Sequence, residues 1–209
     1  MSDHDATRDI CLRRSPSECS DCSIKDRIEC RFRRRSLLRF FLTFLVCIIP
    51  AFAGVILAGY GWFIVGWIIY MALFLQVWEN RILCSHCPYY AEEGTTLRCH
   101  ANYGLRKLWK YQPGPMSRWE RLQFVLGLIL IVAYPLPFMI LGGQYLLFGI
   151  TCLTILIFLA ILSTQMCVHC MNFSCPLNRV PKAVIDTFLR QNPPMKKAWE
   201  EAGYKLDPE

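Results

Sequence analysis

Four long hydrophobic runs, separated by polar segments, set the pattern of the 209-residue chain. The runs are Leu37–Leu57, Trp62–Val77, Leu122–Leu141 and Tyr145–Gln165. About 20 apolar residues in a helix cross the hydrocarbon core of a bilayer. The second run has only 16 residues, and it becomes long enough if its helix continues through Trp78 towards Leu83. The pattern therefore predicts an all-α integral membrane protein with four transmembrane helices.

Short turns that contain glycine join the runs in pairs. Ala58–Gly61 joins the first two runs and Gly142–Gln144 joins the last two. Glycine gives such tight turns the backbone freedom they need. We therefore expect two tandem helical hairpins. The predicted division is a Cys-rich N-terminal segment (1–36), hairpin 1 (37–83), a Cys/His loop (84–120), hairpin 2 (121–166) and a Cys-rich C-terminal tail (167–209).

The charged residues lie on one side of the predicted bundle. Lys and Arg number ten up to Arg39, seven from Arg81 to Arg121 and six from Arg179 onward, and neither turn carries one. Segments rich in Lys and Arg stay in the cytoplasm. We therefore expect a multi-pass membrane protein with both termini and the middle loop in the cytoplasm. The four runs contain no Asp, Glu, Lys or His, which argues against ion-coupled transport.

Each half of the chain ends in the same Cys-x-His-Cys sequence, here called the CxHC motif. The first motif is Cys84–Cys87 and the second is Cys167–Cys170. Each is followed by a further cysteine, Cys99 in the first half and Cys175 in the second. A motif repeated at the same place in both halves predicts a parallel internal repeat about an axis along the membrane normal.

The CxHC motifs predict metal binding, because two cysteines on one tight turn commonly build zinc and iron–sulfur sites. The candidate ligands are Cys84, Cys87, Cys99, Cys167, Cys170 and Cys175. His86, His100 and His169 are either alternative ligands or residues that contact the ligands without binding the metal. Either the two turns share one site, or each half builds its own from three cysteines and a histidine. The spacing leaves both arrangements open. Disulfides are disfavoured, since the cytoplasm is reducing.

A further set of four cysteines lies in the N-terminal segment. Cys11, Cys19, Cys22 and Cys30 follow the near-symmetric pattern C-x7-C-x2-C-x7-C. The residues between them are polar and cannot form an apolar core, so a bound metal would supply the folding energy. The alternative is a polar tail with unliganded thiols. Cys47 and Cys152 lie within hydrophobic runs and are interpreted as packing residues.

The identity of the metal stays open between zinc and an iron–sulfur cluster. A cysteine followed by proline, as in Cys87-Pro88 and Cys175-Pro176, is typical of cluster-binding loops. With the four-helix topology, these pairs resemble the membrane electron-transfer proteins of the quinol-dehydrogenase accessory type, which carry paired cysteine–proline motifs at the cytoplasmic ends of their helices. The spacings here, CxxCP and CxxxxCP, differ from those of that family, and this sequence contains no appended ferredoxin domain. The resemblance implies electron transfer, and no residue roles follow from it.

Our leading hypothesis is a small membrane subunit that carries cytoplasmic, cysteine-ligated metal centres and relays electrons or anchors a redox complex. It need not be an enzyme itself. The alternatives are a zinc-stabilised scaffold or assembly protein, and a membrane thiol–disulfide or metal-transfer enzyme. Besides the bilayer, we expect a protein partner on the cytoplasmic face or a second copy of the chain. No nucleic acid is expected, because the basic and aromatic stretch Asn102–Tyr111 adjoins two membrane helices.

Three local features complete the prediction. Ser117 and Glu120 form an S-x-x-E capping box before the third run. Pro181–Arg190 is expected to be a short helix with one apolar face. Lys196–Ala202 is expected to be a second helix, which Gly203 stops.

Overall fold

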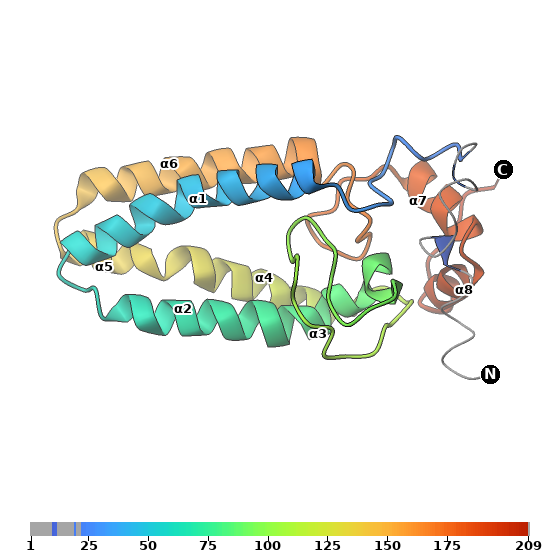
Figure 1. The fold of residues 1–209 in the computed structure, drawn as a ribbon, viewed down its shortest axis with the longest axis horizontal. Helices are drawn as coiled ribbons and strands as arrows, with labels where there is room; N and C mark the ends of the chain where they lie inside the picture. Colours follow the sequence, from blue (N-terminus) through green and yellow to red (C-terminus); the bar gives the residue numbers. More distant parts are fainter. Residues whose placement is uncertain (1–9, 12–18, 20–21, 209) are drawn as a thin grey trace.

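The computed structural model describes residues 10–11, 19 and 22–208, and the chain is helical (Figure 1). Four helical stretches are long and apolar enough to cross a membrane: Arg34–Leu57, Phe63–His86, Arg118–Leu141 and Tyr145–Met166. The described residues contain no β-strand, only an isolated bridge between Thr96 and Arg106. The prediction of an all-helical chain with four membrane-spanning candidates is therefore confirmed.

The four stretches contain several types of helix. The first is α1 (Arg34–Leu57), and the third divides into α4 (Arg118–Ala133) and α5 (Pro135–Leu141). The second consists of α2 (Phe63–Leu73), the π-helix η3 (Phe74–Glu79), α3 (Asn80–Ile82) and the 3₁₀-helix η4 (Cys84–His86). The fourth is α6 (Tyr145–Ile161) followed by the π-helix η6 (Leu162–Met166). Outside these stretches lie the 3₁₀-helix η5 (Pro88–Ala91), α7 (Lys182–Arg190) and α8 (Pro193–Glu201).

The second stretch continues well beyond the hydrophobic run that predicts it. Helical structure follows Val77 without a break, as the expected extension towards Leu83 requires. This extension brings Glu79 and Arg81 into the helical stretch, beyond the hydrophobic run that contains no acidic residue. Glu79 is buried, and its carboxylate accepts a 2.8 Å hydrogen bond from Asn102 Nδ2. This partner lowers the cost of burying a carboxylate.

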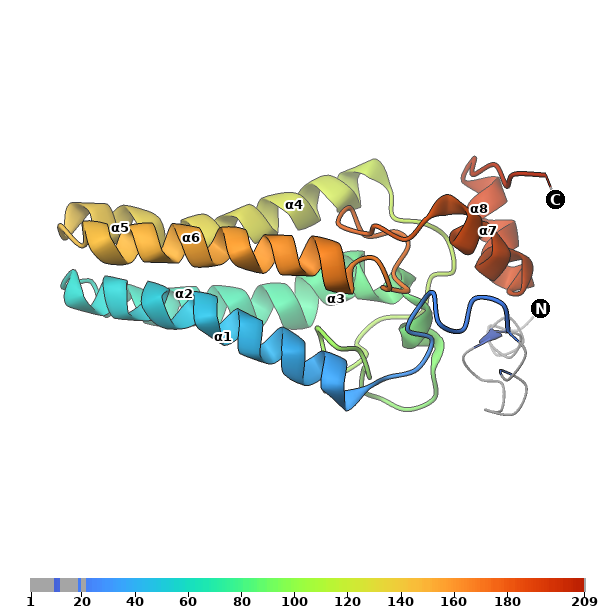
Figure 2. The same cartoon turned by 90° about the horizontal axis from the view of Figure 1, so that it is seen from above.

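The principal contacts between spans join the two halves of the chain. Helix α1 packs mainly against α6 and α5, while α4 contacts both α2 and α3 (Figures 1 and 2). At the turn end, Gly142 comes so close to Ala58 that a Cβ on the glycine would lie 2.6 Å from Ala58 Cα. Glycine therefore lets the two turns meet backbone to backbone.

Proline divides the third stretch into two helices. Helix α4 ends at Ala133, Tyr134 is its C-cap, and α5 begins at Pro135. Proline has no amide hydrogen to donate and its ring clashes with the preceding turn of a helix. The tyrosine hydroxyl at the break donates a 2.9 Å hydrogen bond to the carbonyl oxygen of Phe63, which ties the third stretch to the second.

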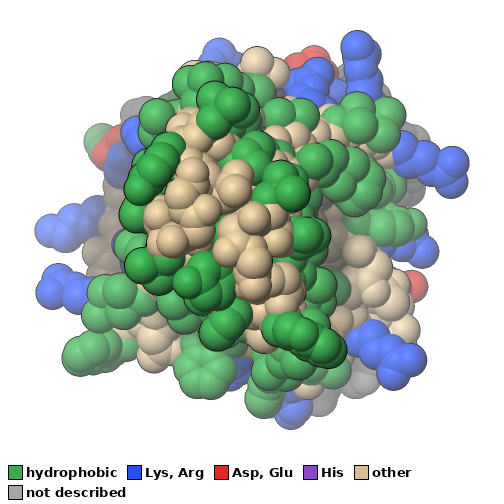
Figure 3. Space-filling view, turned by 90° about the vertical axis from the view of Figure 1, so that its left-hand side faces the viewer, with side chains coloured by type: hydrophobic (Ala, Val, Ile, Leu, Met, Phe, Trp, Pro, Cys, Tyr) green, Lys and Arg blue, Asp and Glu red, His purple; other side chains and the backbone are tan. Residues whose placement is uncertain are grey.

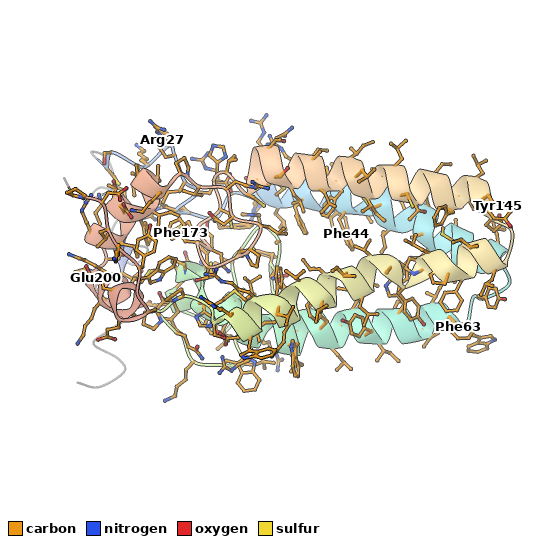
Figure 4. The ribbon with its side chains drawn as sticks, turned by 180° about the vertical axis from the view of Figure 1, so that it is seen from behind. Arg27, Phe44, Phe63, Tyr145, Phe173 and Glu200 are labelled. Atoms are coloured by element: carbon orange, nitrogen blue, oxygen red, sulfur yellow. The ribbon has the colours of Figure 1, made fainter. Side chains whose placement is uncertain are left out.

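The two ends of the bundle differ in composition. Phe63 and Tyr145 mark the turn end, whereas Arg27, Phe173 and Glu200 mark the opposite end (Figure 4). Viewed face-on, the turn end carries hydrophobic side chains, and the Lys and Arg side chains project only around the margin behind it (Figure 3). The opposite end, here called the charged end, holds α7, α8 and the described cysteine-rich segments (Figure 1).

The segments at the charged end share a small hydrophobic core. Ile28, Tyr89, Phe188, Leu189 and Trp199 are all buried in it. Helix α7 has the predicted bounds to within one residue, and Gly203 follows α8 with a φ of +91°. Helix α8 begins at Pro193 instead of the expected Lys196, because proline is well tolerated in the first turn of a helix. The Ser117–Glu120 capping box is present as predicted.

Candidate metal centres

Both CxHC motifs come after a π-helix. In the first half, η3 and α3 precede the motif, and the amide of Cys87 donates a 3.0 Å hydrogen bond to the carbonyl oxygen of Cys84. In the second half, η6 ends at the residue before Cys167. A π-helical turn holds an extra residue and changes the direction in which the following side chains leave the helix. A π-helix therefore precedes the cysteine motif in both halves of the chain.

The structure brings the cysteines of the two halves into one neighbourhood. The members, here called the six-cysteine group, are Cys84, Cys87, Cys99, Cys167, Cys170 and Cys175. Cys87 interacts electrostatically with Cys99 of its own half of the chain and with Cys170 of the second half. Cys170 in turn interacts with Cys99, Cys167 and Cys175. Sulfur atoms from both halves therefore lie within electrostatic range of one another.

Backbone amides approach the sulfur atoms of this group. The clearest case is Cys99, whose sulfur accepts a 3.4 Å hydrogen bond from the amide of Ala101. At three further cysteines a backbone amide two residues along the chain acts to lower the thiol pKa against the effect of burial: Tyr89 at Cys87, Asn172 at Cys170 and Leu177 at Cys175. An amide donor acts in this direction because it favours the thiolate over the thiol. Two of these four cysteines come from each half of the chain.

Glu79 and Asn102 belong to this site, although neither is among the residues predicted from the sequence. Asn102 Nδ2 lies 3.2 Å from Cys84 Sγ as well as 2.8 Å from Glu79 Oε1. Glu79 interacts electrostatically with Cys84, Cys99 and Cys175. Its signal in the sequence is weak: an acidic residue just after a hydrophobic run, on the same helix as the motif.

The thiols of the six-cysteine group that lie outside the membrane-spanning stretches have raised pKa values. Burial raises the pKa of Cys87 and Cys170 well above the usual range, and neighbouring sulfur atoms add repulsion between thiolates. Burial also raises the pKa of Cys99, and it raises that of Cys175 to about 12. Without a cation these thiols stay protonated at neutral pH. A bound metal ion reverses this, because a coordinating thiol loses its proton.

The N-terminal cysteines also come together. Cys30 interacts electrostatically with Cys11, Cys19 and Cys22, and burial, followed by these neighbours, raises its pKa to about 12. The connecting residues 12–18 and 20–21, like residues 1–9 of the predicted N-terminal segment, lie outside the described residues. The amide of Cys11 donates a 2.6 Å hydrogen bond to Asn192 Oδ1. This contact holds the set against the turn between α7 and α8.

The three candidate histidines have partners of their own. His86 Nδ1 lies 2.7 Å from the carbonyl oxygen of Gly114, and its Nε2 lies 3.5 Å from a carboxylate oxygen of Glu120. His169 Nδ1 lies 3.3 Å from the carbonyl oxygen of Gln165.

His100 Nδ1 lies 3.6 Å from Glu29 Oε2. Burial lowers the pKa of this imidazole, while the Glu29 carboxylate acts in the opposite direction. Each of the three histidines therefore has at least one ring nitrogen directed at a group other than a cysteine.

None of the twelve cysteines, all of which lie among the described residues, forms a disulfide. Within residues 10–11, 19 and 22–208, no group of three or more His, Cys, Asp or Glu side chains is arranged as a metal-ion site. The sulfur donors nevertheless have the chemistry that zinc and iron–sulfur clusters require.

Comparisons of the chain with protein-family models, with curated proteins and with solved structures found no match.

Proposed function

We propose that the protein is a membrane subunit that holds a cysteine-ligated iron–sulfur centre at its charged end and relays electrons there to or from a redox partner. The observation that carries the proposal is that Cys87 and Cys99 of the first half interact electrostatically with Cys170 of the second half, and Cys170 in turn with Cys175. These four cysteines are the proposed ligands. Hydrogen bonds to the sulfur atoms are also one of the means by which proteins set the potential of such clusters.

Cysteine–proline pairs favour a cluster over a single zinc ion. Cys87 and Cys175, two of the four proposed ligands, each precede a proline, as ligands in cluster-binding loops do. Four cysteines complete either kind of centre, so Cys84 and Cys167 remain as sulfur donors beside the ligands.

The N-terminal set offers a second centre next to the first. Tyr89 connects the two, since it interacts electrostatically with Cys87, Cys99 and Cys170 while its hydroxyl donates a hydrogen bond to the carbonyl oxygen of Glu29. Cys30 is the next residue in the chain. Two centres linked in this way suit the transfer of electrons through the charged end.

A zinc-stabilised scaffold is the second candidate. The observation that favours it is the irregular structure of residues 22–33, which contain turns and bends and no α-helix of their own. Such a short segment gains much of its folding energy from a bound ion. In this case the protein organises an assembly and transfers no electrons.

The deciding experiment is metal analysis of the full chain purified without oxygen. We expect iron and acid-labile sulfide in comparable amounts, visible cluster absorption, and a paramagnetic signal on reduction. The double variant Cys87→Ser/Cys170→Ser should lose the iron, whereas Cys152→Ser, altered in α6 within a span, should retain it. A colourless protein with bound zinc would favour the scaffold, and a protein that binds neither metal would refute both candidates.

We further propose that the charged end, including both termini and the middle loop, faces the cytoplasm. The one-sided distribution of Lys and Arg supports this orientation. Fluorescent and phosphatase reporters fused to each terminus distinguish the two sides of a bacterial inner membrane. Fluorescence without phosphatase activity at both ends is expected, and phosphatase activity at either end would contradict the orientation.

A further inference from the structure

A basic cavity of about 340 Å³ lies where α1 begins, beside the second CxHC motif. It forms where the chain enters α1 and where the fourth stretch leaves for the second CxHC motif, two segments that lie side by side in Figures 1 and 2. Its cationic lining comes from Lys25, Arg33, Arg35 and Arg39, with His169 opposite. The acidic lining consists of Asp26 and Glu29. Cations therefore outnumber carboxylates around this space.

The carboxylate of Glu29 is already engaged within the protein. Ser36 Oγ donates a 2.6 Å hydrogen bond to Glu29 Oε1, and His100 Nδ1 lies 3.6 Å from Oε2. Among the described residues, Arg33, Arg35 and Arg39 form no ion pair within 4.0 Å. The arginine charges at the cavity are therefore available to an anion from outside.

The geometry of the α1 N-terminus suits a phosphate group. Arg35 and Arg39 are four residues apart and so lie on the same face of the helix. Guanidinium groups bind phosphate through paired hydrogen bonds. No side chain caps the start of this helix, and helix N-termini favour anions. Phosphate is therefore the anion that these groups match best.

Apolar surface continues directly from the basic cavity along α1. Leu38 and Leu42 are 57% and 52% exposed, and they lie on the part of the helix that enters the bilayer. A ligand with a phosphate group and hydrocarbon chains would contact both surfaces at once. A free phosphate ion would use only the first.

We propose that this cavity binds the phosphate of an anionic phospholipid, held by Arg35 and Arg39 with support from Arg33 and Lys25. This proposal is independent of the metal centres. It makes the lipid a specific ligand that fastens the start of α1 to the end of the fourth stretch.

The test is native mass spectrometry of the delipidated full chain, titrated in detergent with phosphatidylglycerol. The double variant Arg35→Gln/Arg39→Gln should weaken binding about tenfold or more, because each arginine supplies charged hydrogen bonds. The matched control is Arg118→Gln/Arg121→Gln, which removes two exposed arginines at the start of α4, outside the cavity. The control should bind as the unaltered protein does. Equal weakening in both variants would show general attraction to basic residues and would overturn the site.

A second measurement needs no substitution. Phenylglyoxal modifies accessible arginines, and phosphatidylglycerol should protect Arg35 and Arg39 severalfold more than Arg118 and Arg121. Phosphatidylcholine and inorganic phosphate, tested separately, should protect far less. Equal protection by inorganic phosphate would refute a lipid as the ligand. No selective protection by any of the three would refute the site itself.

Discussion

The backbone amide of Glu29 donates a 2.9 Å hydrogen bond to the carbonyl oxygen of His169. The carbonyl oxygen of the same glutamate accepts a hydrogen bond from the Tyr89 hydroxyl. One residue of the N-terminal segment is thus bonded to the second CxHC motif and to the loop that follows the first. The segment that carries Cys30 is therefore built into the site formed by the two halves.

Tyr89→Phe should loosen the N-terminal segment without disturbing the spans. The change removes the hydroxyl that donates to Glu29, and a hydrogen bond of this type contributes about 1 kcal/mol. Hydrogen exchange of residues 22–33 should accelerate accordingly. Tyr145→Phe, at the opposite end of the bundle, is the control and should leave this exchange unchanged. Identical protection in the two variants would show that the Tyr89 hydroxyl does not hold the segment.

Asn102→Ala should weaken metal retention in the six-cysteine group. It removes the Nδ2 donor that lies 3.2 Å from Cys84 Sγ and 2.8 Å from Glu79 Oε1. Loss of a group that orients metal ligands typically costs about 10–100-fold in affinity. Competition with a chelator measures the change, with Gln144→Ala at the turn end as control. If both variants release metal at the same chelator concentration, the asparagine has no such role.

Gly142→Ala should destabilise the contact between the two turns. An added Cβ would lie 2.6 Å from Ala58 Cα and 2.8 Å from the Ala58 carbonyl oxygen, so backbone would have to move. Overpacking of this kind costs about 1–3 kcal/mol. Gly61→Ala is the matched control, because a Cβ added to Gly61 would have no neighbouring atom within 4 Å. Thermal unfolding in detergent should show a lower midpoint for Gly142→Ala alone, and equal midpoints would argue against close packing of the turns.

Asp186 should make the docking of the C-terminal helices depend on pH. Burial acts to raise the pKa of this carboxyl. Hydrogen bonds from Lys182, Tyr204 and the amide of Asp207 outweigh burial and hold the pKa below its ordinary value of 3.8. Because the folded-state pKa is depressed, the stabilisation is complete above pH 3.8 and is lost as the pH falls through the folded-state value.

Hydrogen exchange of α7 and α8 measures this effect. Protection should fall below about pH 4 in the unaltered protein, since carboxyl groups of this type titrate there when unfolded. Asp186→Asn should cost about 1 kcal/mol at pH 7 and should flatten the pH dependence. Glu201→Gln, on the exposed side of α8, should preserve it. A pH dependence that survives in Asp186→Asn would assign the effect to another group.

Much of the fold follows from the sequence because the bilayer imposes strict lengths. The four runs, the proline break before Pro135 and the Ser117 capping box all have local causes, and all are present. The pairing of α1 with α6 does not follow in the same way. Both helices are apolar on every side, so no amphipathic face indicates which neighbour each will choose.

The site is foreseeable only in part, for a similar reason. The cysteine motifs can be recognised by their spacing. The N-terminal set comes together around Cys30, as its symmetric pattern suggests. The place of Glu79 in the site cannot be predicted from the sequence, because its partner Asn102 is 23 residues further along the chain and only folding brings the two together. A hydrophobic run ends at Val77, whereas the helix continues beyond it.

The π-helices η3 and η6 set the direction of the cysteine motifs that follow them, which matters for protein engineering. One additional residue in a helix rotates everything downstream by about 100° around its axis. Grafting the cysteine turns onto ordinary α-helical hairpins would therefore rotate the sulfur atoms out of their present directions. The widened turn in each half is as much a part of the design as the cysteines themselves, and an engineered copy would have to preserve both.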